Sequence, residues 1–289
     1  MKTLPPAIRI RAALGAKIPG GGTIYVPQAP KSPIIGECIY CGNKMDLADE
    51  HTIPFALFGV ATLKKASCRD CAAKTQRVEQ RLLRDTFGQV REYLHFPTRK
   101  ARKSRRWSGT RPVTDKRTGD VAQRPLAEGI IALYLAFPDY LPRALGAVPA
   151  DERHEKRSVA FIHLNDAEHP KQDHYEEGWT RFNSADIERC VAKIALCEAI
   201  RQIDESIRDP VLSKFILDGD GDSSEFLGAI ATHDITNEMH RVLHQKLTKE
   251  GGDTVGLMTT VELFSFLPSP SYKVLIRPPS RISFRSPSE

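Results

Sequence analysis

Residues 38–71 read CIYCGNKMDLADEHTIPFALFGVATLKKASCRDC, and this stretch decides how the chain folds. Two Cys-x-x-Cys pairs, Cys38/Cys41 and Cys68/Cys71, stand at its two ends. Each pair can chelate a metal ion from one tight turn, and four thiolates suit the tetrahedral coordination of Zn²⁺. Because a closed Cys₄ site leaves no position for water or substrate, we expect a structural zinc ion here.

The tripeptide Asp49-Glu50-His51 lies between the two cysteine pairs and has a different chemistry. An imidazole can accept a proton from water, while a neighbouring carboxylate can hold a divalent cation that stabilises charge on a phosphate ester. Successive residues of a strand face opposite sides, so Glu50 and His51 can meet only if the chain bends. A solvated acidic turn is the ordinary interpretation of such a tripeptide, and spacing alone does not decide between the two.

The composition limits the class of protein. The chain has 289 residues, of which 40% are hydrophobic and 27% charged, as in globular proteins with a buried core. A net charge of +6 permits a nucleic-acid partner without requiring one. The longest apolar run, residues 129–137, is too short to span a bilayer, and the N-terminus lacks the apolar core of a secretory signal. We therefore expect a cytoplasmic protein with no membrane partner and with reduced cysteines.

Shifts in composition divide the chain into five segments. In order they are a Pro/Gly-rich N-terminal arm (residues 1–33), a zinc-finger module (34–95), a basic loop or linker (96–124), an α+β C-terminal domain (125–277) and a tail (278–289).

The apolar periodicity predicts the main elements. Helices are expected from the second cysteine pair towards residue 93, over residues 126–137, and over residues 186–203, where Ser184 or Asp186 is the N-cap. Strands are expected over residues 158–164, 239–247, 254–267 and 272–276, the last three antiparallel. Cys190 and Cys197 are seven residues apart on one helix face, and we expect buried packing thiols.

A strongly basic run follows the finger. It contains Arg99, Lys100, Arg102, Lys103, Arg105 and Arg106, six cations within eight positions. Lysine and arginine side chains that neutralise phosphates release counterions and add affinity that does not depend on sequence. A solvated loop is the alternative for any charge run, but this position beside the finger favours contact with DNA.

The string Cys-Ile-Tyr-Cys-Gly, then Asp-Glu-His-Thr-Ile-Pro, then Ala-Ser-Cys-Arg-Asp-Cys resembles an HNH endonuclease of the zinc-containing type. The resemblance covers residues 38 to about 80, roughly a seventh of the chain. The fold it implies is α+β: a zinc-stapled ββα-metal finger, with a hairpin that carries His51 and a helix after Cys71, followed here by the mixed C-terminal domain.

The resemblance also implies roles for single residues. His51 would be the general base that activates water, and Glu50 would bind a catalytic Mg²⁺ or similar ion, with Asp49 as a reserve ligand. The family usually has Asn or His directly after the last cysteine, where this chain has Ala72. Glu79, two helical turns further along a similar face, is the candidate oxygen donor in its place.

These features lead to one main hypothesis and two alternatives. The main hypothesis is a metal-dependent HNH-type endonuclease that hydrolyses DNA phosphodiester bonds. The first alternative, favoured by Ala72, is a catalytically degenerate zinc protein with a DNA-binding or regulatory role. In the second alternative the C-terminal region senses a partner or ligand and the finger is its effector.

Overall fold

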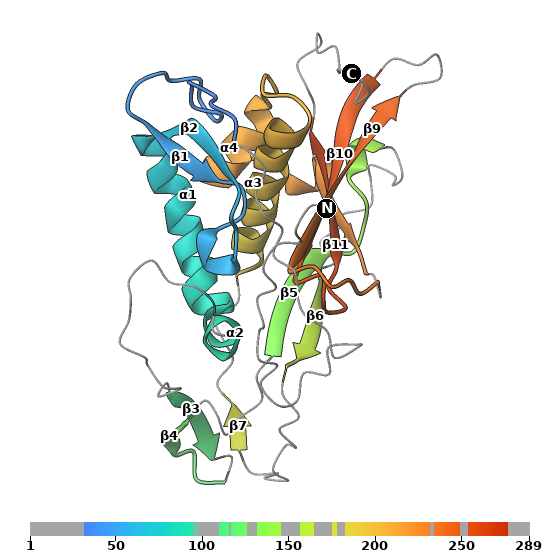
Figure 1. The fold of residues 1–289 in the computed structure, drawn as a ribbon. Helices are drawn as coiled ribbons and strands as arrows, with labels where there is room; N and C mark the ends of the chain where they lie inside the picture. The colour runs from blue at the N-terminus through green and yellow to red at the C-terminus, as the bar shows by residue number, and fades with distance from the viewer. Residues whose placement is uncertain are drawn as a thin grey trace, which may run out of the picture.

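The computed structural model describes residues 32–94, 96, 110–115, 117–125, 132–145, 157–164, 175–177, 183–231, 234–248 and 254–276. Almost all of the predicted N-terminal arm, the whole predicted tail and the basic run at residues 99–106 lie outside the described residues. Within them the chain has mixed helix and strand content, and its strands form antiparallel sheets (Figure 1).

The helical elements are η1 (Phe55–Leu57), α1 (Arg69–Arg81), the π-helical turn η2 (Leu82–Thr86), α2 (Gly88–Tyr93), η4 (Arg143–Leu145), α3 (Ser184–Gln202), α4 (Pro210–Asp218) and η5 (Ser223–Glu225). The strands are β1 (Leu47–His51), β2 (Thr62–Cys68), β3 (Thr110–Asp115), β4 (Val121–Pro125), β5 (Ala132–Pro138), β6 (Arg157–His163), β7 (Tyr175–Glu177), β8 (Leu227–Ile230), β9 (His240–Thr248), β10 (Thr254–Leu263) and β11 (Ser271–Ile276). They pair in the orders β1-β2, β8-β11-β10-β9, β4-β3-β7 and β5-β6.

The cysteine-bounded segment forms a hairpin followed by a helix. Strands β1 and β2 pair antiparallel, from Leu47 opposite Cys68 to His51 opposite Thr62. Helix α1 then begins at Arg69, within the second cysteine pair as the periodicity predicted, so that the last cysteine, Cys71, lies in its first turn. Cys71, Thr75 and Val78 are the buried residues of α1, a spacing that places one face of the helix against the core.

Helix α3 is the central element of the fold. It contacts α1 and α4 on one side and β5, β10 and β11 on the other (Figure 1). The long helix predicted here is confirmed, but its N-cap is Asn183, whose side chain accepts hydrogen bonds from the backbone N–H groups of Ala185 and Asp186. Because α3 is covered on both sides, nearly every residue from Asp186 to Ile200 is buried.

The C-terminal strands agree with their prediction, whereas one predicted helix is wrong. Strands β9, β10 and β11 form an antiparallel sheet, and β6 covers the strand expected over residues 158–164. The described part of the helix expected over residues 126–137 is instead strand β5, which pairs with β6 from Ala132 opposite His163. A short apolar run fits a buried strand as well as a buried helix, and here pairing with β6 satisfies its backbone.

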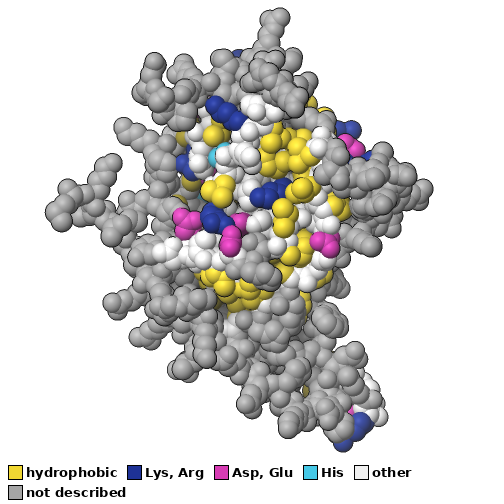
Figure 2. Space-filling model, turned by 90° about the vertical axis from the view of Figure 1, so that its right-hand side faces the viewer, with side chains coloured by type: hydrophobic (Ala, Val, Ile, Leu, Met, Phe, Trp, Pro, Cys, Tyr) yellow, Lys and Arg dark blue, Asp and Glu magenta, His cyan; other side chains and the backbone are white. Residues whose placement is uncertain are grey.

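The side of the molecule that carries the C-terminal sheet in Figure 1 faces the viewer in Figure 2. On the described part of this face, Lys and Arg side chains are scattered among apolar and acidic ones (Figure 2). Within the C-terminal sheet itself, Arg241 of β9 pairs with Glu262 of β10, and their Nε and Oε2 atoms are 2.5 Å apart. Mixed charge of this kind does not favour a nucleic-acid surface here.

One hydrophobic core joins the finger to the rest of the chain. It contains Leu57 and Leu63 of the finger, Ile194 of α3 and Val261 of β10, all of them fully buried. Polar contacts reinforce the join, because the guanidinium of Arg81 makes two hydrogen bonds to the Asp186 carboxylate, of 2.8 and 2.6 Å. The finger is therefore held at a fixed position on α3.

Candidate functional site

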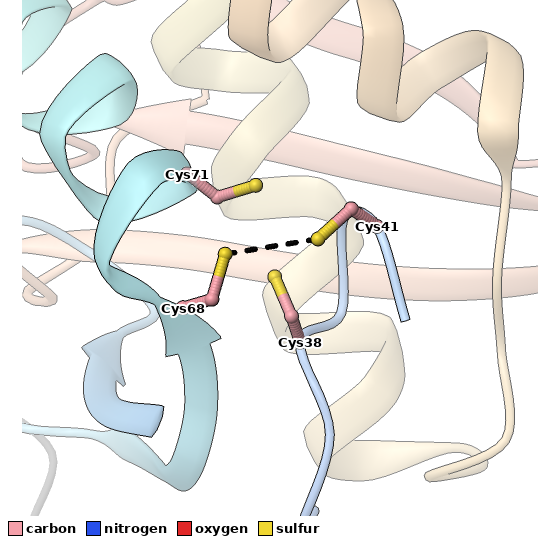
Figure 3. A group of neighbouring side chains, drawn as sticks. All are labelled: Cys38, Cys41, Cys68 and Cys71. Carbon is pink, nitrogen blue, oxygen red and sulfur yellow. Dashed lines mark hydrogen bonds between the residues drawn. The ribbon is translucent and has the colours of Figure 1, made fainter. Parts of the chain in front are cut away.

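Four cysteine side chains from three elements point toward one centre (Figure 3). Their sulfur atoms lie within 4.8 Å of one another, and the sulfurs of Cys41 and Cys68 are 3.7 Å apart. Four thiolates around Zn²⁺, with Zn–S bonds of about 2.3 Å, have neighbouring sulfurs about 3.8 Å apart. The cluster of Cys38, Cys41, Cys68 and Cys71 could therefore hold a zinc ion.

Local backbone contacts hold the first cysteine pair in a tight turn. The N–H of Gly42 donates to the Cys38 carbonyl at 2.8 Å, and the N–H of Cys38 donates to the Asn43 carbonyl at 2.7 Å. Gly42 has a φ of +74°, a conformation that residues with a side chain rarely adopt. The N–H of Ile39 donates to the Ala66 carbonyl, which ties this turn to β2 beside the second pair.

The electrostatics of the cluster also favour a cation. Burial, and then the charge of Cys38, raise the pKa of the Cys71 thiol well above its usual value. Thiols packed this closely cannot all ionise unless a positive ion offsets their mutual repulsion. A zinc ion at their centre supplies that charge.

A compact loop follows the tripeptide and connects β1 to β2. The N–H of Thr52 donates to the Ala61 carbonyl at 3.0 Å, which closes the loop at its base. A Cβ atom added to Gly59 would lie 1.8 Å from the Ile53 carbonyl oxygen, so only glycine fits there. His240 of β9 holds the far end of the loop through a 2.6 Å hydrogen bond between its Nε2 and the Leu57 carbonyl.

His240 makes the fold sensitive to acid. Its Nδ1 accepts the N–H of Phe264, and burial lowers the pKa of this imidazole from 6.5 to about 4. The unfolded chain therefore binds a proton more readily than the folded chain. This contribution to stability is complete above pH 6.5 and is lost as the pH falls from 6.5 to about 4.

We predict that His240 accounts for a loss of about 3 kcal/mol in the free energy of unfolding over this interval. Urea titrations of the wild type and of His240→Gln at several pH values measure it. Glutamine does not titrate, so the free energy of unfolding of His240→Gln should decrease less than that of the wild type as the pH falls. An equal decrease in both proteins would contradict the assignment.

His51 is one of the residues that line an open cavity between the hairpin and α1. The cavity has a volume of about 540 Å³, and its walls include Ala72, Gln76 and Glu79 of α1 and Arg91 of α2. His51 is partly buried, and the ring of Phe55 packs against it edge to face at 6.0 Å. The candidate base therefore lies beside a space that water and a ligand can enter.

Asp49, the expected reserve metal ligand, lies at an irregularity of the hairpin. The register of β1 and β2 shifts between Ala48 and Glu50. The Asp49 carboxylate accepts the N–H of Lys65 at 3.1 Å and pairs with the Lys64 ammonium at 2.7 Å. These contacts, the Lys64 hydrogen bond first, hold the pKa of Asp49 below its usual value. The carboxylate thus already has a structural role at the bulge.

Glu50 and Glu79 converge, but on a lysine. The Nζ atom of Lys193, from α3, is 2.9 Å from an oxygen of Glu50 and 2.9 Å from an oxygen of Glu79. The same ammonium donates to the backbone carbonyl of His51. The structure thus brings together the two carboxylates that the sequence suggested as metal ligands, and it adds a cation to them.

Lys193 remains charged in this buried position. Burial acts to lower the pKa of its ammonium, but the nearby charges of Glu50 and Glu79 outweigh burial and raise the pKa well above the usual value. Burial also raises the pKa of Glu50, and the Lys193 charge opposes that rise. An ammonium between two carboxylates offsets much of the cost of burying all three groups.

Lys193 was not predicted as a site residue from the sequence, although its position on the helix indicates a buried charge. It lies three residues after Cys190 and four before Cys197, on the stripe expected to be buried. A lysine on the apolar face of a helix must find an anion or reach solvent. Its partners Glu79 and His51 are 114 and 142 residues away along the chain, so the sequence of the helix alone could not identify them.

The remaining predicted positions give three further outcomes. Ala72 lies in the wall of the cavity and offers no donor side chain, as the sequence indicated. The six basic residues between Arg99 and Arg106 lie outside the described residues, so their contact with DNA stays a prediction. Cys190 and Cys197 are buried, as predicted, and the Cys197 sulfur is 3.8 Å from the Tyr40 hydroxyl oxygen.

Within the part of the chain that the structure describes, no helix has the length and apolar character needed to cross a membrane. Comparisons with protein-family models, with curated proteins and with solved structures find no match. What this chain does must therefore be argued from the geometry around His51 and the four cysteines.

Proposed function

We propose that the finger formed by β1, β2 and α1 is an HNH-type phosphodiester hydrolase that acts on DNA, with His51 as its general base. The observation that supports this most is the position of His51 in the wall of an open cavity of about 540 Å³. A general base must reach both the attacking water and the substrate. The hairpin-then-helix order and the cysteine cluster agree with the ββα-metal finger that the resemblance implies.

In this proposal the zinc ion has a structural role only. Four sulfur ligands fill a tetrahedral site, and Cys38, Cys68 and Cys71 are nearly inaccessible to solvent. The ion would hold the end of β2 and the start of α1 against the first cysteine turn. That arrangement fixes the walls of the cavity beside His51.

A catalytic Mg²⁺ does not fit the donors as they are arranged. Such an ion would supply positive charge to the scissile phosphate. Of the expected ligands, Asp49 is engaged at the bulge, and Glu50 and Glu79 hold Lys193. Ala72 provides no oxygen or nitrogen side-chain atom. The groups that act on the phosphate in our proposal are therefore those of the chain.

The hydrolytic step uses two of these groups. His51 removes a proton from water, the water oxygen attacks the phosphorus, and the bond from phosphorus to the departing sugar oxygen breaks, that oxygen taking a proton from solvent. Arg91 lines the same cavity, and its guanidinium donates to the carbonyl oxygens of Ala56 and Leu83 at 2.9 Å each. A guanidinium fixed in this way can stabilise charge that develops on the phosphate.

We predict that His51→Ala lowers the rate of plasmid cleavage by about 10²–10⁴-fold, the usual contribution of a general base. Agarose-gel assays of supercoiled plasmid, run in Mg²⁺, Mn²⁺, Ni²⁺ and EDTA, measure the rate. The matched control is His244→Ala, which removes a partly buried imidazole from β9, far along the chain from the finger. Unchanged cleavage by His51→Ala, with normal zinc content and circular dichroism, would rule out this role.

Two observations favour a second candidate, a finger that binds DNA without cutting it. Ala72 removes the side chain usual at that position in the family, and Lys193 takes up both candidate carboxylates. Under this alternative the wild type nicks no plasmid DNA, whether a divalent ion or EDTA is present. Fluorescence anisotropy with labelled duplex DNA would still show binding, and the affinity would fall steeply with salt.

A further inference from the structure

The ammonium of Lys193 occupies a position where three oxygen atoms converge. These are a carboxylate oxygen of Glu50, a carboxylate oxygen of Glu79 and the backbone carbonyl oxygen of His51. Each carboxylate oxygen is 2.9 Å from Nζ. Carboxylates and a backbone carbonyl are also the donors that hard divalent cations take in proteins. In this chain the same donors surround a side chain from α3.

The Lys193 ammonium can donate one hydrogen bond to each of the three oxygen atoms. An ammonium group has three N–H donors and no acceptor, which equals the number of oxygens that it contacts. The side chains of Lys193, Glu50 and Glu79 are 2%, 9% and 21% exposed, so the ammonium itself is closed off from water while Glu79 borders the cavity. The three oxygens come from β1 and α1, and α3 brings the charge to them.

A divalent cation and this ammonium cannot share the position. Two positive groups within bonding distance of the same oxygens repel strongly, most of all where solvent is excluded. Lys193 also has little freedom to move away, because α3 is buried on both sides along its middle turns. A second metal ion would therefore have to displace a packed side chain.

We propose that Lys193 is a built-in cation that takes the place of a second metal ion in the finger. It holds Glu50, Glu79 and the backbone of His51 in one arrangement, and it leaves the Cys₄ cluster as the single metal site formed by these elements. Lys193 is thus a positioning residue supplied by α3. The proposal concerns cation binding and does not depend on whether His51 cleaves DNA.

Manganese binding tests the proposal without an activity assay. Zinc-loaded wild type, Lys193→Ala, Glu50→Gln and the double variant Lys193→Ala/Glu50→Gln are titrated with Mn²⁺, and free Mn²⁺ is measured by electron paramagnetic resonance. The wild type and Glu50→Gln should give the same titration. Lys193→Ala should take up about one additional Mn²⁺ per chain, and the double variant should lose it.

Thermal unfolding supplies a second measurement on the same samples. Mn²⁺ should raise the melting temperature of Lys193→Ala and leave that of the wild type unchanged, since only the variant has an unoccupied pair of carboxylates. Uptake of Mn²⁺ by the wild type that Glu50→Gln abolishes would overturn the proposal. A folded Lys193→Ala that takes up no Mn²⁺ would overturn it as well. If Lys193→Ala does not fold, the comparison of wild type with Glu50→Gln decides alone.

Discussion

Replacing Cys71 with serine is expected to abolish stoichiometric zinc binding and to unfold the finger. Serine lacks the thiolate that a tetrahedral zinc site requires, and the remaining three sulfurs of the cluster would keep their mutual repulsion. Structural zinc contributes about 10–16 kcal/mol of binding free energy in small zinc domains, and a variant that no longer binds the ion loses that stabilisation of the finger. Because the hairpin shares its core with α3, the loss should also lower the stability of the C-terminal region.

Zinc content by mass spectrometry and urea unfolding by circular dichroism measure these effects. The matched control is Cys190→Ala, which removes an equally buried thiol from α3, outside the cluster. This control should retain one zinc ion per chain. A Cys71→Ser protein with full zinc content and wild-type stability would contradict the assignment of the cluster as a metal site.

Replacing Lys193 with methionine is the second change with a large expected effect. Methionine has a similar length and no charge, so Glu50 and Glu79 would be left close together without their common cation. Removing one partner of a buried ionic cluster typically costs about 3–5 kcal/mol, and we expect a decrease of that size in the free energy of unfolding. The loss should be smaller near pH 5 than at pH 8, since protonation relieves the repulsion between carboxylates.

Two controls separate this effect from loss of packing. Lys214→Met removes an exposed lysine of α4 that pairs with Asp220 at 3.4 Å, and surface pairs of this kind contribute little. The double variant Lys193→Met/Glu50→Gln removes one of the two uncompensated charges and should recover part of the lost stability. If Lys193→Met were as stable as the wild type in urea titrations, the ionic cluster would not hold the finger to α3.

The sequence predicted those features that depend on local patterns. The two Cys-x-x-Cys pairs predicted a cluster that could hold a metal ion, because the short spacing within each pair keeps its two thiols close together. The apolar stripe of α3 is long enough to define a helix, and the alternating strands at the C-terminus define a sheet. These patterns act over a few neighbouring residues, which is why a single sequence sufficed to find them.

Features that depend on distant partners were not accessible in this way. Residues 132–137 form a strand because their backbone pairs with residues 158–163 of β6, which lie more than twenty residues later in the chain. The N-cap of α3 is a local miss instead: Asn183, and not the predicted Ser184, has the extended backbone and accepts the N–H groups of Ala185 and Asp186. Glu79 was selected from helical spacing as a possible ligand, yet its actual partner, Lys193, comes from a helix 114 residues away.

The central claim is that His51 acts as the base in a cavity formed by the hairpin and α1, and chemical rescue tests it most directly. The measurement is the initial rate of plasmid cleavage by wild type and by His51→Gly, with and without added imidazole, at equal zinc content. We predict cleavage by the wild type, a loss of about 10²–10⁴-fold in His51→Gly, and partial recovery with imidazole, which can enter the enlarged cavity and accept the proton. A wild type that leaves the plasmid intact, or a His51→Gly protein that cleaves as fast as the wild type, would contradict it.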